Sequence, residues 1–129
     1  MSTWKSFEEI EAWQLAREFC NDVFGIMQYE GLNKDYRLKD QLNGSSGSIM
    51  DNISEGYERG GNKEFIYFLS IAKGSAGESR SQLYRVYDRN YISKEEFDSL
   101  IEKVVNISGK IQNLMNYLKK SNYKGPKFR

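Results

Sequence analysis

The chain has 129 residues, 39% of them hydrophobic and 29% charged, with a net charge of +1 and no histidine. This composition is typical of a single soluble domain, and no apolar run approaches the roughly 18 residues that a membrane-spanning helix needs. The absence of histidine and the single cysteine, Cys20, rule out histidine acid–base chemistry and an internal disulfide, and they argue against a transition-metal site or a bound cofactor.

The first helix is predicted to begin at Ser6. Ser6 and Glu9 have the spacing of a capping box, and Gly31 and Asn33 are expected to end the helix. Cys20 is interpreted as a small buried hydrophobic residue. The segment before this helix shows neither a basic leader nor an apolar core, so we expect no secretory signal and a cytoplasmic protein. The apolar stripe follows steps of three and four and comprises Phe7, Ile10, Trp13, Ala16, Cys20, Val23, Phe24 and Met27.

The second helix is predicted over residues 35–59, and its centre is built of small residues. Its thin apolar stripe is Leu38, Leu42, Ile49 and Ile53, and between these lie Gly44, Ser45, Ser46, Gly47 and Ser48. A glycine costs a helix about 1 kcal/mol relative to alanine. Tertiary packing must therefore supply the stability that propensity lacks. The run predicts a helix that packs closely against its neighbours.

The third and fourth helices are predicted over residues 62–90 and 93–121. A Gly-Gly pair separates the third helix from the second, and Asn62 is expected to cap it. Ser93 and Glu96 form a second capping box in front of the clearest amphipathic stripe of the chain.

Four long helices joined by short connections predict an all-α fold, namely a single antiparallel up-down-up-down four-helix bundle over residues 1–121. Residues 122–129 are expected to form a flexible basic tail. Charge is unevenly distributed, because residues 1–61 carry six basic and eleven acidic side chains whereas residues 62–129 carry thirteen and seven. Such polarity suits nucleic-acid contact or self-association.

A polar cluster is predicted between the second and third helices. Ser48, Asn52 and Glu55 share one helical face, and Ser75 and Glu78 lie in a second zone of small residues. Two carboxylates can perform acid–base chemistry when their pKa values are split, but a compact bundle offers little room for a cleft. We therefore interpret the cluster as a device that fixes helix register, with a binding role as the alternative, and expect no enzymatic activity.

A basic and aromatic surface is the stronger functional candidate. Arginines bind phosphates bidentately and tyrosines stack on unpaired bases, so RNA or DNA contact is expected where both occur at helical spacing. The same spacing also suits core or subunit contacts, and a basic tail can be a solvated end without a partner. The candidate residues on the third helix are Arg80, Tyr84, Arg85, Tyr87, Arg89 and Tyr91, and those near the carboxyl terminus are Lys119, Lys120, Lys124, Lys127 and Arg129.

A pattern of residues spread over all four predicted helices extends from about residue 5 to residue 118. It comprises Trp13, Gln14, Tyr36, Leu38, Gln41, Leu42, Ser48, Ile49, Asn52, Ile53, Glu55, Gly56, Lys63, Glu64, Phe65, Phe68, Leu69, Ile71, Ala72, Lys73, Gly74, Ser75, Glu78, Tyr91, Ile92, Ser93 and Phe97. This pattern resembles that of the bacterial four-helix bundle proteins, also called 23S rRNA-intervening-sequence proteins. The resemblance implies an up-down-up-down bundle that assembles into a ring, commonly a homopentamer.

The resemblance also bears on function. Some members of that family are encoded inside insertions in large-subunit ribosomal RNA genes, and a related branch binds nucleic acid as an accessory to the reverse transcriptases of diversity-generating retroelements. We therefore expect a non-enzymatic, ring-forming helical scaffold that contacts RNA or DNA, with or without a protein partner, and no membrane association. The alternative is a purely structural or protein-binding homo-oligomer with no nucleic-acid role.

Overall fold

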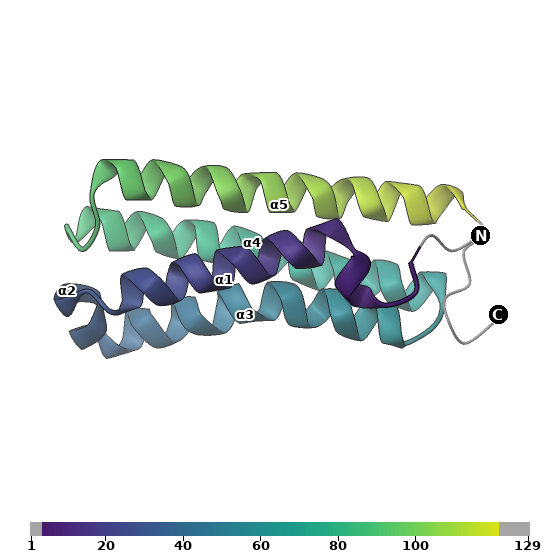
Figure 1. The fold of residues 1–129 in the computed structure, drawn as a ribbon, viewed down its shortest axis with the longest axis horizontal. Coiled ribbons are helices and arrows are strands. Elements are labelled where there is room, and N and C mark those ends of the chain that lie inside the picture. Colours follow the sequence, from purple (N-terminus) through teal and green to yellow (C-terminus); the bar gives the residue numbers. More distant parts are fainter. Residues whose placement is uncertain (1–3, 122–129) are drawn as a thin grey trace.

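The computed structural model describes residues 4–121, and all regular elements in that range are helices (Figure 1). Four long helices lie side by side, and a short helix, α2, lies in the connection between the first two of them. The elements are the 3₁₀-helix η1 (Phe7–Glu9) and the α-helices α1 (Glu11–Met27), α2 (Glu30–Lys34), α3 (Tyr36–Glu58), α4 (Asn62–Asp88) and α5 (Lys94–Lys120). The predicted all-α class is confirmed, with one short α-helix more than the four predicted. The predicted tail, residues 122–129, lies outside the described residues.

The long helices enclose one hydrophobic core. Each contributes a stripe of buried side chains at steps of three and four, such as Phe65, Leu69 and Ala72 of α4. The predicted stripes are largely buried, but Phe24 is 61% exposed because it lies beyond the edge of the buried row that Val23 and Met27 continue. The interface between α3 and α4 is the most extensive, and that between α1 and α5 is the smallest among neighbouring long helices. No helix in the described range is long and apolar enough to cross a bilayer.

The predicted start of the first helix at Ser6 is wrong. The Ser6 side chain caps nothing, and α1 begins only at Glu11. Glu9 accepts a hydrogen bond from the backbone N–H of Lys5 (3.1 Å) rather than from that of Ser6. Because the chain turns between η1 and α1 with Ile10 in an extended conformation, the Ile10 side chain enters the core. Burial of Ile10 therefore overrides the local capping signal.

The connection between α1 and α3 also differs from the prediction, because Gly31 lies inside the short helix α2. A Cβ atom at Gly31 would lie 2.6 Å from Cδ1 of Tyr91, so only glycine lets α2 approach that ring. The α4–α5 turn supplies Tyr91, and Asn90 in the same turn adopts a left-handed conformation (φ 62°) that asparagine tolerates better than most residues. The two connections therefore pack against each other at one end of the bundle.

The two predicted caps on the later helices have different outcomes. The capping box of α5 is confirmed, since Ser93 Oγ accepts from Glu96 N–H (3.1 Å) and Glu96 Oε1 accepts from Ser93 N–H (2.9 Å). Asn62, however, is the first residue of α4 and Gly61 occupies the cap position. The Asn62 amide instead donates to the carbonyl of Leu118 (2.7 Å), near the carboxyl end of α5. The residue expected to begin one helix thus stabilises the end of another.

Candidate nucleic-acid interface

Three of the residues predicted to cluster between α3 and α4 are in contact. Ser75 Oγ donates to Ser48 Oγ (2.9 Å), and the Asn52 amide donates both to Ser48 Oγ (2.8 Å) and to the Ser48 carbonyl (2.8 Å). The bond between Ser75 and Ser48 joins the two helices, and the bonds of Asn52 satisfy its side chain within α3. The register role predicted for Ser48, Asn52 and Ser75 agrees with this geometry.

The two carboxylates are not part of that cluster. Glu55 is exposed and forms an ion pair with Arg59 one turn later (2.8 Å), while Glu78 is exposed and accepts from the amide of Gln82 (3.3 Å). Because α3 and α4 are antiparallel with Ser48 beside Ser75, Glu55 and Glu78 lie at levels about 15 Å apart along the axis. They cannot act as a pair of acid–base groups.

A second polar cluster lies deeper in the same interface and was missed in the sequence. Ser45 Oγ lies 2.8 Å from Ser79 Oγ and 2.6 Å from Oε1 of Gln82, and all three side chains are buried. The only sequence signal for it was that Ser45, Ser79 and Gln82 fall on the core side of their helices. The interface between α3 and α4 therefore has a hydrogen-bonded polar centre that is satisfied from within the chain.

The glycines of α3 and α4 play two different roles. A Cβ atom at Gly56 would lie 2.7 Å from Phe68 Cβ and 3.3 Å from the Phe65 carbonyl oxygen, so Gly56 sets the close approach of the helices. At Gly44, Gly47, Gly74 and Gly77 a Cβ atom would meet nothing within 4 Å. The expectation that these glycines pack the helices against each other within the chain is therefore wrong for those four positions. The neighbouring serines fill the interface instead.

The three arginines predicted as one basic surface lie on two sides of α4. Five positions of an α-helix correspond to a rotation of about 140°. Arg80 therefore lies on the side of α4 that carries Tyr84, which contacts Phe97 of α5, whereas Arg85 lies on the side that contacts α3. Arg85 donates to Oε1 of Gln41 (3.1 Å), which places the Gln41 side chain between the helices. Arg89 forms an ion pair with Asp35 (2.6 Å). Arg80 is exposed and has no hydrogen bond or ion pair to any described residue.

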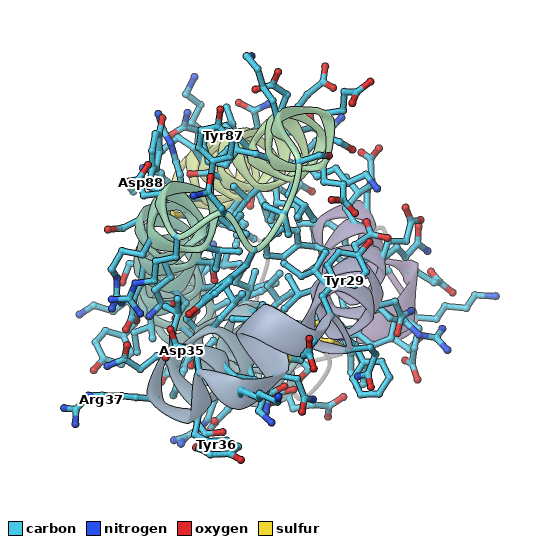
Figure 2. The ribbon with its side chains drawn as sticks, turned by 90° about the vertical axis from the view of Figure 1, so that its left-hand side faces the viewer. Tyr29, Asp35, Tyr36, Arg37, Tyr87 and Asp88 are labelled. Carbon is cyan, nitrogen blue, oxygen red and sulfur yellow. The ribbon has the colours of Figure 1, made fainter. Side chains whose placement is uncertain are left out.

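Asp35 connects the two turns at one end of the bundle (Figure 2). Besides the contact with Arg89, Asp35 Oδ2 accepts from the Tyr91 hydroxyl (2.9 Å), and Oδ1 accepts from Leu38 N–H (3.4 Å) at the start of α3. The hydrogen bond from Tyr91, supported by Arg89 and Leu38, lowers the pKa of Asp35, and the same bond raises the pKa of Tyr91. In Figure 2, Tyr36 points away from the bundle while Asp35 lies between the start of α3 and the end of α4. Arg89 therefore contacts Asp35 within the chain at this end of the bundle.

The aromatic part of the predicted surface is only partly available for stacking. Tyr87 stacks on Phe97 of α5 with ring centroids 4.6 Å apart, and Tyr91 is bonded to Asp35. Tyr84 meets Phe97 edge to face at 5.0 Å, yet 47% of it is exposed. Tyr84 lies one helical turn after Arg80. Of the predicted set, Arg80 and Tyr84 form the part that can reach a ligand from outside.

The carboxyl end of α5 is the other predicted basic site. Lys119 and Lys120 are exposed in the last turn of α5, where cations interact favourably with the helix dipole. Lys124, Lys127 and Arg129 lie outside the described residues. Cys20 of α1 is half-buried, and its thiol donates to the Ser46 carbonyl of α3 (3.2 Å). Burial raises the pKa of Cys20, which favours the unreactive thiol.

Comparison with known proteins places the chain in a family. The family model described as 23S rRNA-intervening sequence protein matches residues 8–113. The chain belongs to this family. A solved structure similar to this 23S rRNA-intervening sequence protein is that of a protein with unknown function from the S23 ribosomal protein family of Bacteroides thetaiotaomicron VPI-5482. The two are 22% identical with a TM-score of 0.75, over 81% of this chain and 97% of that one. None of the curated proteins matches. Within residues 4–121 no group of acidic and cysteine side chains is arranged to hold a metal ion.

Proposed function

We propose that this protein is a non-enzymatic helical scaffold of the cytoplasm that assembles into a ring, such as a homopentamer, and contacts RNA or DNA. The observation that carries the nucleic-acid role is the pairing of Arg80, which has no partner among the described residues, with the half-exposed ring of Tyr84. An arginine beside an open aromatic face suits a phosphate and its adjoining unpaired base. The cationic end of α5 adds a second contact, and the family description agrees with a link to ribosomal RNA.

Binding to labelled single-stranded RNA, followed by fluorescence anisotropy over a series of salt concentrations, tests this role. Arg80→Ala is expected to weaken binding and to lower the slope of log K against log salt by about 1, because one phosphate contact is lost. Arg85→Ala is the matched control, since it removes the same charge from the same helix at a side chain already bonded to Gln41. Equal effects of the two substitutions, or no binding at low salt with tens of micromolar protein, would falsify the nucleic-acid role.

The second candidate is a structural or protein-binding homo-oligomer without a nucleic-acid role. Its support is the set of glycines on the outer faces of α3 and α4, Gly44, Gly47, Gly74 and Gly77, beside which no other part of residues 4–121 lies. Each costs the helix about 1 kcal/mol relative to alanine, a cost that a closely approaching second subunit would offset. Gly74→Gln should reduce assembly in native mass spectrometry, whereas Gly109→Gln, at an open position of α5, should not. A strictly monomeric wild-type mass at micromolar concentration would exclude assembly.

A further inference from the structure

The interface between α1 and α5, called the seam below, differs from the other helix contacts in size and in the side chains that bridge it. It is the smallest interface between neighbouring long helices, and four polar or aromatic pairs bridge the two helices or the segments that flank them. These pairs are the ion pairs Glu11–Lys110 and Asp22–Lys103, the hydrogen bond from Tyr29 to Glu96, and the ring contact of Trp4 with Tyr117. A cavity lies towards each end of this interface.

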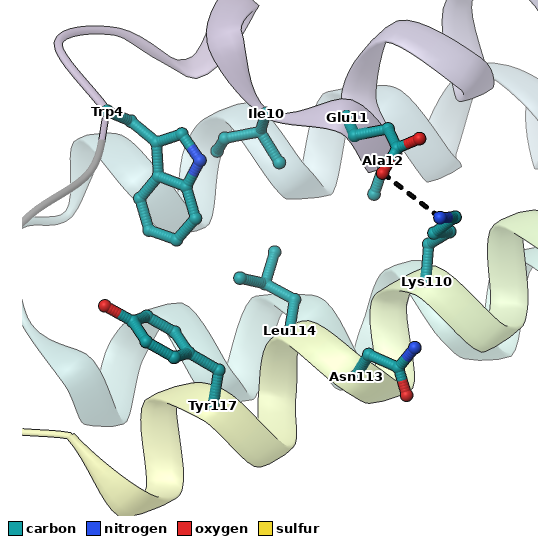
Figure 3. Close-up of a pocket in the computed structure, with 8 residues that line it drawn as sticks. All are labelled: Trp4, Ile10, Glu11, Ala12, Lys110, Asn113, Leu114 and Tyr117. Atoms are coloured by element: carbon teal, nitrogen blue, oxygen red, sulfur yellow. Dashed lines mark ion pairs between the residues drawn. The ribbon is translucent and has the colours of Figure 1, made fainter.

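The cavity at the end near the amino terminus has a volume of about 400 Å³, within the range of small-molecule sites. Figure 3 shows Trp4 and Ile10 on one side of it, facing Leu114 and Tyr117 of α5. The rings of Trp4 and Tyr117 stand nearly perpendicular (86°) with centroids 6.0 Å apart. Ile10 and Ala12 are buried and supply an apolar wall. This part of the cavity suits an apolar chain or ring.

The other end of the cavity is polar and contains one ion pair, between Glu11 and Lys110. Lys110 Nζ lies 3.2 Å from Glu11 Oε1, with the Lys110 side chain 38% exposed and that of Glu11 64% exposed (Figure 3). Such a solvated ion pair contributes little to stability, so an anion can replace the Glu11 carboxylate at small cost. Asn113 lies at the same end and offers an amide donor. The charged residues of α5 from Lys103 onward are all lysines, so this wall favours an anion over a cation.

We propose that this cavity binds a small carboxylic acid with an apolar body, such as a medium-chain fatty acid. The ligand carboxylate replaces Glu11 beside Lys110 and accepts from the Asn113 amide, and the apolar body lies against Leu114 and the apolar wall of Ile10 and Ala12, at the edge of the contacting Trp4 and Tyr117 rings. Lys110 and Tyr117 are two turns apart on α5, about 10 Å along the axis, which sets the length of the ligand. This site is separate from Arg80 and does not depend on the nucleic-acid role.

Octanoate titrated into the full-length chain tests the proposal, with octanol and octylamine as ligands of the same length and different charge. In a Trp13→Phe background Trp4 is the one remaining tryptophan, so its fluorescence reports the cavity directly. A saturable change is expected, with octanoate binding more tightly than the other two ligands. Lys110→Gln should weaken octanoate about tenfold, the loss of one charge-assisted hydrogen bond, and should leave octanol binding unchanged.

Two further substitutions make the result specific to this cavity. Lys103→Gln removes the same charge and a similar ion pair from the same seam, but Lys103 lines the other cavity, so octanoate binding should not change. Asn113→Phe places a large ring at the entrance of the cavity and should abolish binding. Because Asn113 is an exposed residue of α5, the substitution should leave the far-UV circular dichroism spectrum unchanged. The proposal is overturned by equal affinity for octanoate and octanol, by equal losses in the Lys103 and Lys110 variants, by binding that survives Asn113→Phe, or by no saturable response.

Discussion

The close approach of α3 and α4 at Gly56 gives a sharp quantitative prediction. A Cβ atom there would lie 2.7 Å from Phe68 Cβ, and 3.1 Å and 3.3 Å from Cδ1 and the carbonyl oxygen of Phe65. Two of these three atoms belong to the backbone or are attached directly to it, so no side-chain rotation can remove them. Gly56→Ala must therefore push the two helices apart along their most extensive interface.

The net effect of Gly56→Ala follows from two opposing contributions. Alanine favours the helix by about 1 kcal/mol over glycine, while overpacking a well-packed interior costs about 1–3 kcal/mol and more where backbone must move. We expect the free energy of unfolding to fall by about 1 kcal/mol or more. Gly109→Ala is the matched control, because the same substitution on α5 meets nothing within 4 Å and should raise stability by about 0.5–1 kcal/mol.

Urea unfolding followed by far-UV circular dichroism measures both variants under the same conditions. The two midpoints should move in opposite directions with unchanged m-values, which shows that stability and not the denatured state has changed. In a thermal scan the difference corresponds to about 4 °C per kcal/mol for a domain of this size. If Gly56→Ala stabilises the protein as much as Gly109→Ala, the close approach of α3 and α4 is not as the structure describes and the reasoning is refuted.

Three further outcomes follow from individual contacts. Hydrogen bonding lowers the pKa of Asp35, so its stabilising effect should be full above the unfolded-state pKa and be lost as pH falls through the lower folded-state pKa. Asp35→Asn should therefore be less stable than wild type at neutral pH and converge with it in acid unfolding curves. Asn62→Ala removes the bond to the Leu118 carbonyl, which should cost about 1 kcal/mol and speed hydrogen exchange in the last turn of α5, with exchange at Ser93 unaltered. Because burial raises its pKa, Cys20 should react with iodoacetamide more slowly than a free thiol peptide until the protein is unfolded, and an equal rate would contradict its burial.

Two capping patterns with the same spacing show when the local sequence is enough to predict where a helix begins. Ser93 and Glu96 form both bonds of the capping box, whereas Ser6 and Glu9, with the same spacing, form neither. At the start of α5 the Tyr29 hydroxyl donates to the other carboxylate oxygen of Glu96, so both bonds of the capping box remain. At the amino terminus the chain must turn so that Ile10 reaches the core, and the energy of burying that side chain exceeds that of one cap. The long helices were predictable because their periodicity is sustained, and this boundary was not because tertiary contacts decide it.

The glycines and arginines of the site show the same distinction between features that the local sequence predicts and features that tertiary contacts decide. Gly56 continues the spacing of Ile49 and Ile53, so its place in the interface could have been predicted from the helical repeat. The rotation between Arg80 and Arg85 could likewise have separated them onto two faces. What no local pattern contains is the partner on another helix, such as Asp35 for the arginine near the end of α4. Assigning a charged side chain to binding or to structure therefore required the packed fold.

The polar interior of the α3–α4 interface limits where this protein can recognise another molecule. Ser45, Ser48 and Asn52 are bonded within the chain, so a phosphate or substrate that engaged them would first have to break those bonds in a buried setting, at a cost of about 1–3 kcal/mol for each group left unpaired. By contrast, Arg80 of α4 has no partner to give up among the described residues, and Lys110 of α5 gives up only a solvated ion pair. The two recognition sites proposed above, beside α4 for a nucleic acid and beside α1 for a small acid, are therefore sites where a ligand would break few existing contacts.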